Sequence, residues 1–134
     1  MLNINDLRKA EHKVLMIGSH PGIIQSMLDY DFLSGHTAPS ILCIVASGRK
    51  YERFFFGKKE ILLPVYSALT SVPKDIKQKI NAVINVSSGR RVLTSMIEAI
   101  DGLPSLKLGT VFAEGVPEKH SIDLFEYAKE KNVV

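Results

Sequence analysis

The stretch that decides the fold runs from His12 to Leu28 and reads HKVLMIGSHPGIIQSML. Its first part, residues 12–17, is a short apolar run typical of a buried strand, and it ends at Gly18. Pro21 then opens a segment in which apolar residues return at helical spacing, namely Ile23, Ile24, Met27 and Leu28. The stretch therefore predicts a strand, a tight turn and a helix.

The next segments continue this alternation. Residues 41–46 form a continuous apolar run, which is expected when both faces of a strand are covered, as in a parallel sheet. Residues 53–56 and 60–65 are expected to be short extended pieces around Gly57, forming a small hairpin. Because Pro64 cannot donate to a ladder, we expect this hairpin at the edge of the sheet.

The second half of the chain repeats the pattern. We expect a helix over 72–80, a strand over 82–86, a helix after the turn 87–90, a strand over 108–113, a helix from 117 to 131 and the start of another strand at 132–134. Strands that alternate with helices through short turns imply right-handed crossovers. The predicted fold class is therefore α/β, a Rossmann-like domain with a mostly parallel sheet flanked by helices.

Length and composition limit the classes of protein. With 134 residues, 46% of them hydrophobic and 23% charged, the chain is expected to form one domain over residues 1–134. The single cysteine, Cys43, excludes a disulfide framework and a cysteine-rich zinc site, and it favours a reducing, cytoplasmic setting. No apolar run is long enough for a membrane span, and the first residues do not resemble a signal peptide.

Charge and histidine spacing exclude two further classes. A net charge of +3 is too small to indicate nucleic-acid binding by the whole domain. The four histidines are scattered without ligand spacing, so no metal site is expected. Residues 49–59 do hold five cations and one acid, which suits either a phosphorylated small molecule or a solvated hairpin tip.

Ligands of parallel sheets bind at the carboxyl ends of the strands, which here are four turns at residues 18–22, 46–50, 87–91 and 113–117. In the first turn, Gly18 and Ser19 precede a helix N-terminus whose free N–H groups suit a phosphate. The glycine spacing is not that of a dinucleotide-binding loop. Gly18 is therefore either a phosphate-turn residue or a turn glycine only, and His20 either contacts a ligand or simply belongs to the turn.

The third and fourth turns also carry polar groups. Ser87 and Ser88 offer hydroxyls and Arg90 offers a fork of donors, a combination suited to phosphate or amide groups, although helix capping by a serine is the alternative. Glu114 follows the last strand, where its carboxylate either faces the same cleft or acts as a cap or a solvated acid.

Four segments in this order and spacing closely resemble the CoA-binding domain of ATP citrate lyase. They are MLDYDF at 27–32, FGKKEILLPVY at 56–66, INVSSGR at 84–90 and AEGVPE at 113–118. The domain is similar, more distantly, to the first part of the α subunit of succinyl-CoA synthetase, and citryl-CoA synthetase shares it. The resemblance covers about residues 13–134.

The resemblance implies a reaction in which a histidine is phosphorylated from ATP, the phosphoryl group passes to citrate, and CoA attacks the acyl phosphate to give a thioester. In that reaction this domain holds CoA. By position, the residues implied in CoA binding are Gly18, Ser19 and His20, then Ala46, Ser47 and Arg49 beside the adenosine phosphates, then Ser87, Ser88 and Arg90, and finally Ala113 and Gly115 around Glu114, which would lie near the thiol and act in catalysis.

The family's phosphohistidine, ATP-grasp and citrate-synthase-like domains have no counterpart in the sequence, so ATP and Mg²⁺ would act only through other domains or subunits, and oligomer formation is left open. The isolated chain is expected to be inactive as a complete ligase. The alternative is a stand-alone nucleotide-binding module, a sensor or scaffold for NAD or CoA without catalytic activity. NAD binding would favour an acid at the end of the strand over 41–46, which instead continues as Ala46, Ser47, Gly48 and Arg49.

Overall fold

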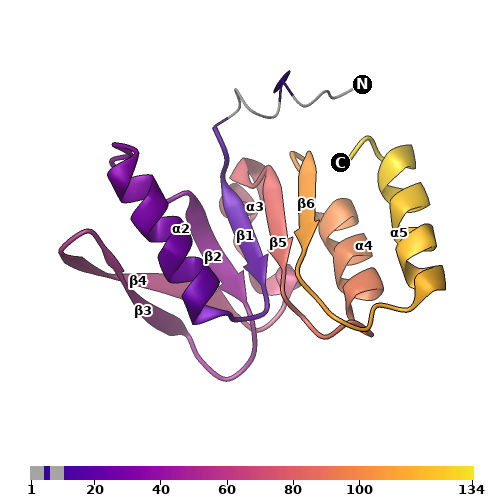
Figure 1. Cartoon of the computed structure of the whole chain (residues 1–134), viewed down its shortest axis with the longest axis horizontal. Helices are drawn as coiled ribbons and strands as arrows, with labels where there is room; N and C mark the ends of the chain where they lie inside the picture. The colour runs from indigo at the N-terminus through magenta and orange to yellow at the C-terminus, as the bar shows by residue number, and fades with distance from the viewer. Residues whose placement is uncertain (1–4, 7–10) are drawn as a thin grey trace.

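The computed structural model describes residues 5–6 and 11–134, which include a six-stranded sheet (Figure 1). The strands are β1 (Val14–Ile17), β2 (Ile41–Val45), β3 (Tyr51–Phe56), β4 (Lys59–Tyr66), β5 (Ala82–Asn85) and β6 (Leu108–Val111). Their order across the sheet is β3-β4-β2-β1-β5-β6. All neighbouring strands are parallel except β3 and β4, which form an antiparallel hairpin.

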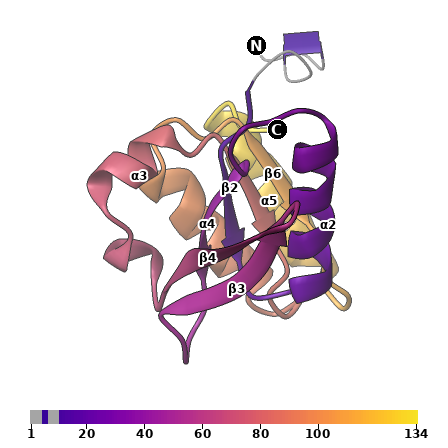
Figure 2. The same cartoon turned by 90° about the vertical axis from the view of Figure 1, so that its left-hand side faces the viewer.

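Helices lie on both faces of this sheet. They are α2 (Pro21–Leu33), α3 (Lys74–Lys79), α4 (Val92–Gly102) and α5 (Glu118–Glu130), with a 3-10 turn at Leu69–Ser71. Helix α2 lies on one face, whereas α3 and α4 lie on the opposite face (Figure 2). The fold is therefore a three-layer sandwich with the sheet in the middle.

Strand β1 shows why the apolar runs of the sequence are unbroken. Met16 packs on the α2 side against Ile24 and Leu28, whereas Leu15 packs on the other side with Val92 and Met96 of α4. Successive side chains of a strand point to opposite faces. Because each face of the sheet has its own apolar core, every position of this strand has to be apolar.

The predicted fold class is confirmed, and strand and helix ends differ from the expected ones by a few residues. The hairpin lies at the edge of the sheet as expected, with β3 outermost, although Pro64 itself is on the inner strand β4, between β3 and β2. The parallel ladder with β2 joins only Ile44 to Val65 and Val45 to Tyr66, so it begins just after the proline. Pro64 therefore withholds no donor from that ladder.

Two smaller features concern the ends of the sheet and of the chain. The expected strand over 108–113 ends at Val111, because residues 112 and 113 already belong to the turn. At the chain end, the N–H of Val134 donates to the Lys107 carbonyl at 2.9 Å, and the Val134 carbonyl accepts from Gly109 N at 2.8 Å. Val134 thus pairs beside β6. Among the described residues, none of the helices has the length and apolarity that crossing a membrane requires.

The core predicts the behaviour of the only thiol. Cys43 is fully buried on β2, and burial raises the pKa of its thiol to about 12. Since the thiolate is the reactive form, we expect alkylation of Cys43 by iodoacetamide at pH 8 to be at least about 100-fold slower in the native protein than in urea. Mass spectrometry of the timed reaction measures both rates. Similar rates would show that β2 is not covered as described.

Candidate functional site

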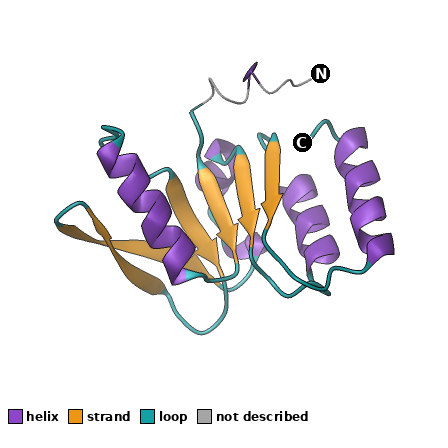
Figure 3. Cartoon of the chain, in the orientation of Figure 1, coloured by secondary structure: helices purple, strands orange, loops and turns teal. Residues whose placement is uncertain are grey.

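The carboxyl ends of β1, β5 and β6 meet at one edge of the sheet, where α2 and α4 also begin (Figure 3). The first turn is held there by close packing. A Cβ atom at Gly18 would lie 3.0 Å from Val86 Cγ2 and 3.3 Å from Ser87 N, and its φ of +88° favours glycine. Gly18 N also donates to the Val45 carbonyl at 2.8 Å. The first turn therefore touches the third turn and the end of β2.

Gly89 brings the third turn against the fourth. A Cβ atom at Gly89 would lie 2.4 Å from the carbonyl oxygen of Glu114 and 2.6 Å from the carbonyl carbon of Gly115. Both are backbone atoms, so the two turns are in direct main-chain contact. The structure thus brings together three of the four turns that the sequence indicated.

The third turn is positioned by a buried side chain that the sequence analysis did not single out. Asn85 is fully buried, and its Oδ1 accepts from Ser87 N at 3.0 Å and from Ser87 Oγ at 2.6 Å. Its Nδ2 donates to Ser95 Oγ of α4 at 2.8 Å. The sequence signal that could have identified Asn85 is its place as a polar residue at the end of an otherwise apolar strand.

The alternative that a serine caps α4 is wrong. The N-cap residue is Arg91, without a side-chain cap bond, and the Ser87 hydroxyl bonds to Asn85 instead. Ser88 and Arg90 are exposed on the same turn. Their side chains are therefore available at the edge of the sheet, whereas the hydroxyl proton of Ser87 is already engaged.

The first turn carries two side-chain contacts. His20 is the N-cap of α2, where its Nδ1 accepts from Ile23 N at 3.1 Å. Ser19 Oγ donates to Oε1 of Glu52 at 2.7 Å, and Glu52 is buried although it lies on β3. Sequence reasoning missed Glu52, because only the folded hairpin brings it to this turn.

The second turn borders the first. Ala46 N donates to the Tyr66 carbonyl at 2.9 Å, which fixes the end of β2 beside β4. Ser47 and Arg49 are exposed in the loop that follows. These residues therefore lie at the same edge but present their side chains to solvent.

Glu114 lies in the fourth turn, and its side chain is exposed. Capping of α5 is not its role, because the N-cap of that helix is Pro117 and no side chain caps it. Ala113 is half-buried before it, and Gly115 follows with a φ of +70°. The carboxylate is thus free of a capping role, at a turn that the Gly89 contact fixes.

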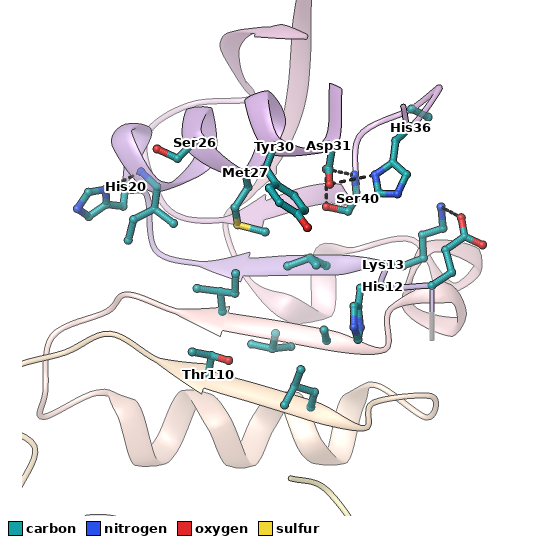
Figure 4. Close-up of a pocket in the computed structure, with 18 of the residues that line it drawn as sticks. His12, Lys13, His20, Ser26, Met27, Tyr30, Asp31, His36, Ser40 and Thr110 are labelled. Atoms are coloured by element: carbon teal, nitrogen blue, oxygen red, sulfur yellow. Dashed lines mark hydrogen bonds and ion pairs between the residues drawn. The ribbon is translucent and has the colours of Figure 1, made fainter. Parts of the chain in front are cut away.

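A groove of about 930 Å³ lies over the sheet beside α2 and reaches the first turn at His20. Met27 and Tyr30 point from α2 toward the strands, and Thr110 of β6 lies opposite (Figure 4). At its far end Asp31 is buried and accepts from Ser40 N at 2.8 Å and Ser40 Oγ at 2.6 Å. Of the predicted site residues, only His20 lines this groove. The described residues contain no group of His, Cys, Asp and Glu side chains that could hold a metal ion.

A mostly parallel sheet covered on both faces, with its turns joined at the carboxyl edge, is the arrangement of Rossmann-like α/β domains. No protein-family model matches the sequence. It is 32% identical over 135 residues to a probable ATP-citrate synthase subunit 1 of Schizosaccharomyces pombe, a match that covers 96% of this chain and 21% of the relative. It is 36% identical over 112 residues to ATP-citrate synthase beta chain protein 1 of Arabidopsis thaliana, covering 83% of this chain and 18% of the relative.

Solved structures agree with these relatives. The ATP citrate lyase of Methanothrix soehngenii, solved with citrate and coenzyme A, matches with a TM-score of 0.86 and 28% identity, over 92% of this chain and 20% of that one. A mutant ATP citrate lyase of Methanosaeta concilii, solved with (3S)-citryl-CoA, matches equally well, with a TM-score of 0.86. The chain is a homologue of one domain of the ATP citrate lyase family, and the predicted resemblance is confirmed. It spans about a fifth of the length of the relatives it matches.

The contact between the third and fourth turns predicts the effect of one added methyl group. We expect Gly89→Ala to lower the free energy of unfolding by about 1 to 3 kcal/mol, because two backbone segments would have to move apart. The matched control is Gly22→Ala, where the nearest atom to the new Cβ is His20 Cε1 at 3.4 Å. We expect the control to change stability by less than about 0.5 kcal/mol. Urea denaturation measures both, and equal losses would contradict the contact.

Proposed function

We propose that this chain is the CoA-binding domain of an enzyme of the ATP citrate lyase type, and that it presents CoA for ATP-dependent thioester formation on citrate. The observation that carries the proposal is the joining of three turns at the carboxyl edge of the sheet through Gly18 and Gly89. The likeness to a structure solved with citrate and coenzyme A supports the choice of ligand.

The phosphate-bearing part of CoA would bind where backbone donors and cations are available. Helices α2 and α4 both begin at this edge, and the N-terminal end of a helix attracts anions. Arg90 is exposed beside the start of α4, and Arg49 is exposed in the second turn. We assign phosphate contacts to these two arginines, and further contacts with CoA to the turns at Gly18–His20, Ala46–Ser47 and Ser87–Ser88.

Glu114 would act at the opposite end of the ligand. Its exposed carboxylate, between Ala113 and Gly115, is proposed to accept the proton of the CoA thiol. The sulfur then attacks the acyl carbon of citryl phosphate, the thioester bond forms, and inorganic phosphate leaves with the electrons of the broken C–O bond.

Other domains or subunits would supply the rest of the reaction. The relatives are subunits or chains of ATP-citrate synthase that are about five times as long as the matched region. The phosphohistidine, ATP-grasp and citrate-synthase-like parts, with ATP and Mg²⁺, are assigned to such partners. In this proposal the isolated chain binds CoA without turning it over.

Binding by the two arginines can be tested directly. Charge-assisted contacts contribute roughly 1.5 to 3 kcal/mol each, so Arg49→Ala and Arg90→Ala should each weaken CoA binding about tenfold or more. The affinity for dephospho-CoA should fall less in Arg49→Ala than the affinity for CoA does, because that arginine is assigned to the adenosine phosphates. Lys107→Ala is the charge-matched control at the other end of β6 and should leave the affinity unchanged. Isothermal titration calorimetry measures all four proteins, and equal affinities would contradict the assignment.

The role of Glu114 separates from a structural one by kinetics. In the assembled enzyme, Glu114→Gln should lower thioester formation by about 10²- to 10⁴-fold, as expected for a lost general base. Because the side chain is exposed, stability and CoA affinity should stay within about 1 kcal/mol of wild type. Stopped-flow assays of CoA consumption provide the rate. A variant as fast as the wild type would exclude Glu114 as the base.

A further inference from the structure

A second acid at this edge of the sheet is unexplained by the contacts described so far. Glu52 is only 8% exposed, and while its Oε1 accepts from Ser19, its Oε2 is buried without a hydrogen-bond partner. Buried carboxylate oxygens in native proteins are almost always paired, because leaving one unpaired is costly. Glu52 therefore lacks one donor.

Specific contacts between β3 and α2 hold this carboxylate at the first turn. Gln25 of α2 holds β3 by two bonds, donating to the Phe55 carbonyl at 2.8 Å and accepting from Phe55 N at 3.1 Å. Phe32 and Phe56 pack edge to face, with ring centroids 5.5 Å apart. These contacts fix β3 against α2, so the position of Glu52 behind Ser19 is a property of the packed hairpin.

Neighbouring cations do not supply the missing donor. Arg53, the next residue along β3, lies 3.5 Å from Glu60, and both side chains are largely exposed on the other side of the hairpin. The buried Oε2 has no partner among the other residues of the hairpin either. The described residues thus supply no donor to Oε2, and a ligand bound beside Ser19 can supply one.

The chemistry of a carboxylate restricts what that donor can be. An ionised carboxylate only accepts hydrogen bonds, and it repels phosphate oxygens. Among the parts of a nucleotide, the ribose hydroxyls and the amino group of adenine can donate. In dinucleotide-binding α/β domains an acid near this crevice accepts from a ribose hydroxyl, although there it follows the second strand.

We propose that Glu52, oriented by Ser19, is the acceptor that holds the nucleoside part of the bound ligand through a ribose hydroxyl or the adenine amino group. This inference rests on the proposed function, since it concerns the same ligand. It divides the site, with the nucleoside beside Ser19 and Glu52 and the phosphates beside Arg49, Arg90 and the N-terminal ends of the helices. It also places an acid at the crevice, although the residues between the end of β2 and Glu52 include no acid.

The test compares Glu52→Gln with Glu60→Gln, which removes the same charge from the exposed side of the hairpin. Calorimetric titrations use CoA, adenosine 3′,5′-bisphosphate, which contains the nucleoside, and 4′-phosphopantetheine, which lacks it. We expect Glu52→Gln to weaken the first two about tenfold and to leave the third within twofold, while Glu60→Gln changes none of them by more than twofold. Nucleoside probes that bind to Glu52→Gln as tightly as to the wild type would overturn the inference, as would an equal loss for 4′-phosphopantetheine.

ADP and IDP identify the donor, because IDP lacks the amino group. If Glu52→Gln weakens both equally, the donor is a ribose hydroxyl; if it weakens only ADP, the donor is the amino group. Should Glu52→Gln fail to fold, Ser19→Ala removes the bond that orients the carboxylate and should weaken the same nucleoside probes by a smaller factor. If the wild type binds ADP but not CoA, and Glu52→Gln weakens the binding of ADP, the proposed function is contradicted and this inference stands. A wild type that binds none of the probes overturns both.

Discussion

The contact between Gly89 and the backbone of Glu114 and Gly115 is the constraint on which the site depends. At 2.4 Å from the Glu114 carbonyl, no side-chain carbon fits, so only glycine lets the turn after β5 lie on the turn after β6. Gly18 makes a similar approach to Val86 and Ser87 from the turn after β1. The turns after β1, β5 and β6 are therefore in contact, and together they form one continuous surface at the carboxyl edge of the sheet. The proposed ligand lies across that surface.

Around this surface the charges are separated. The acid Glu52 lies behind the first turn on the α2 side, whereas Arg90 is exposed beside α4 and Glu114 lies on the fourth turn. A ligand with a donor-rich nucleoside, an anionic middle and a thiol at its end carries groups that match these charges in the same order. The packing of β3 on α2 through Gln25 and the hydrogen bonds of Asn85 hold the two sides in place.

The sequence predicted what local periodicity encodes. The alternation of strands and helices, the buried character of residues 14–17 and the position of the turns all follow from apolar spacing and glycine or proline punctuation. The edge position of the hairpin was predicted correctly, but composition did not reveal that Pro64 lies on its inner strand, where pairing with β2 begins only at Val65. Glu52 was missed because it meets Ser19 across 33 residues, a separation that no local pattern reveals. The groove beside α2 was missed for a related reason, since the exposed part of a sheet face depends on which helices pack there.

That groove is also the main rival for the ligand, so the most direct measurement is a CoA titration of the ¹⁵N-labelled chain followed by amide chemical shifts. The account predicts the largest shifts at the carboxyl edge, at residues 18–19, 87–91 and 114–115, with little change at Tyr30 and Thr110. Shifts confined to Tyr30, Thr110 and the other groove residues, with the edge unchanged, would contradict the claim that the joined turns form the binding site.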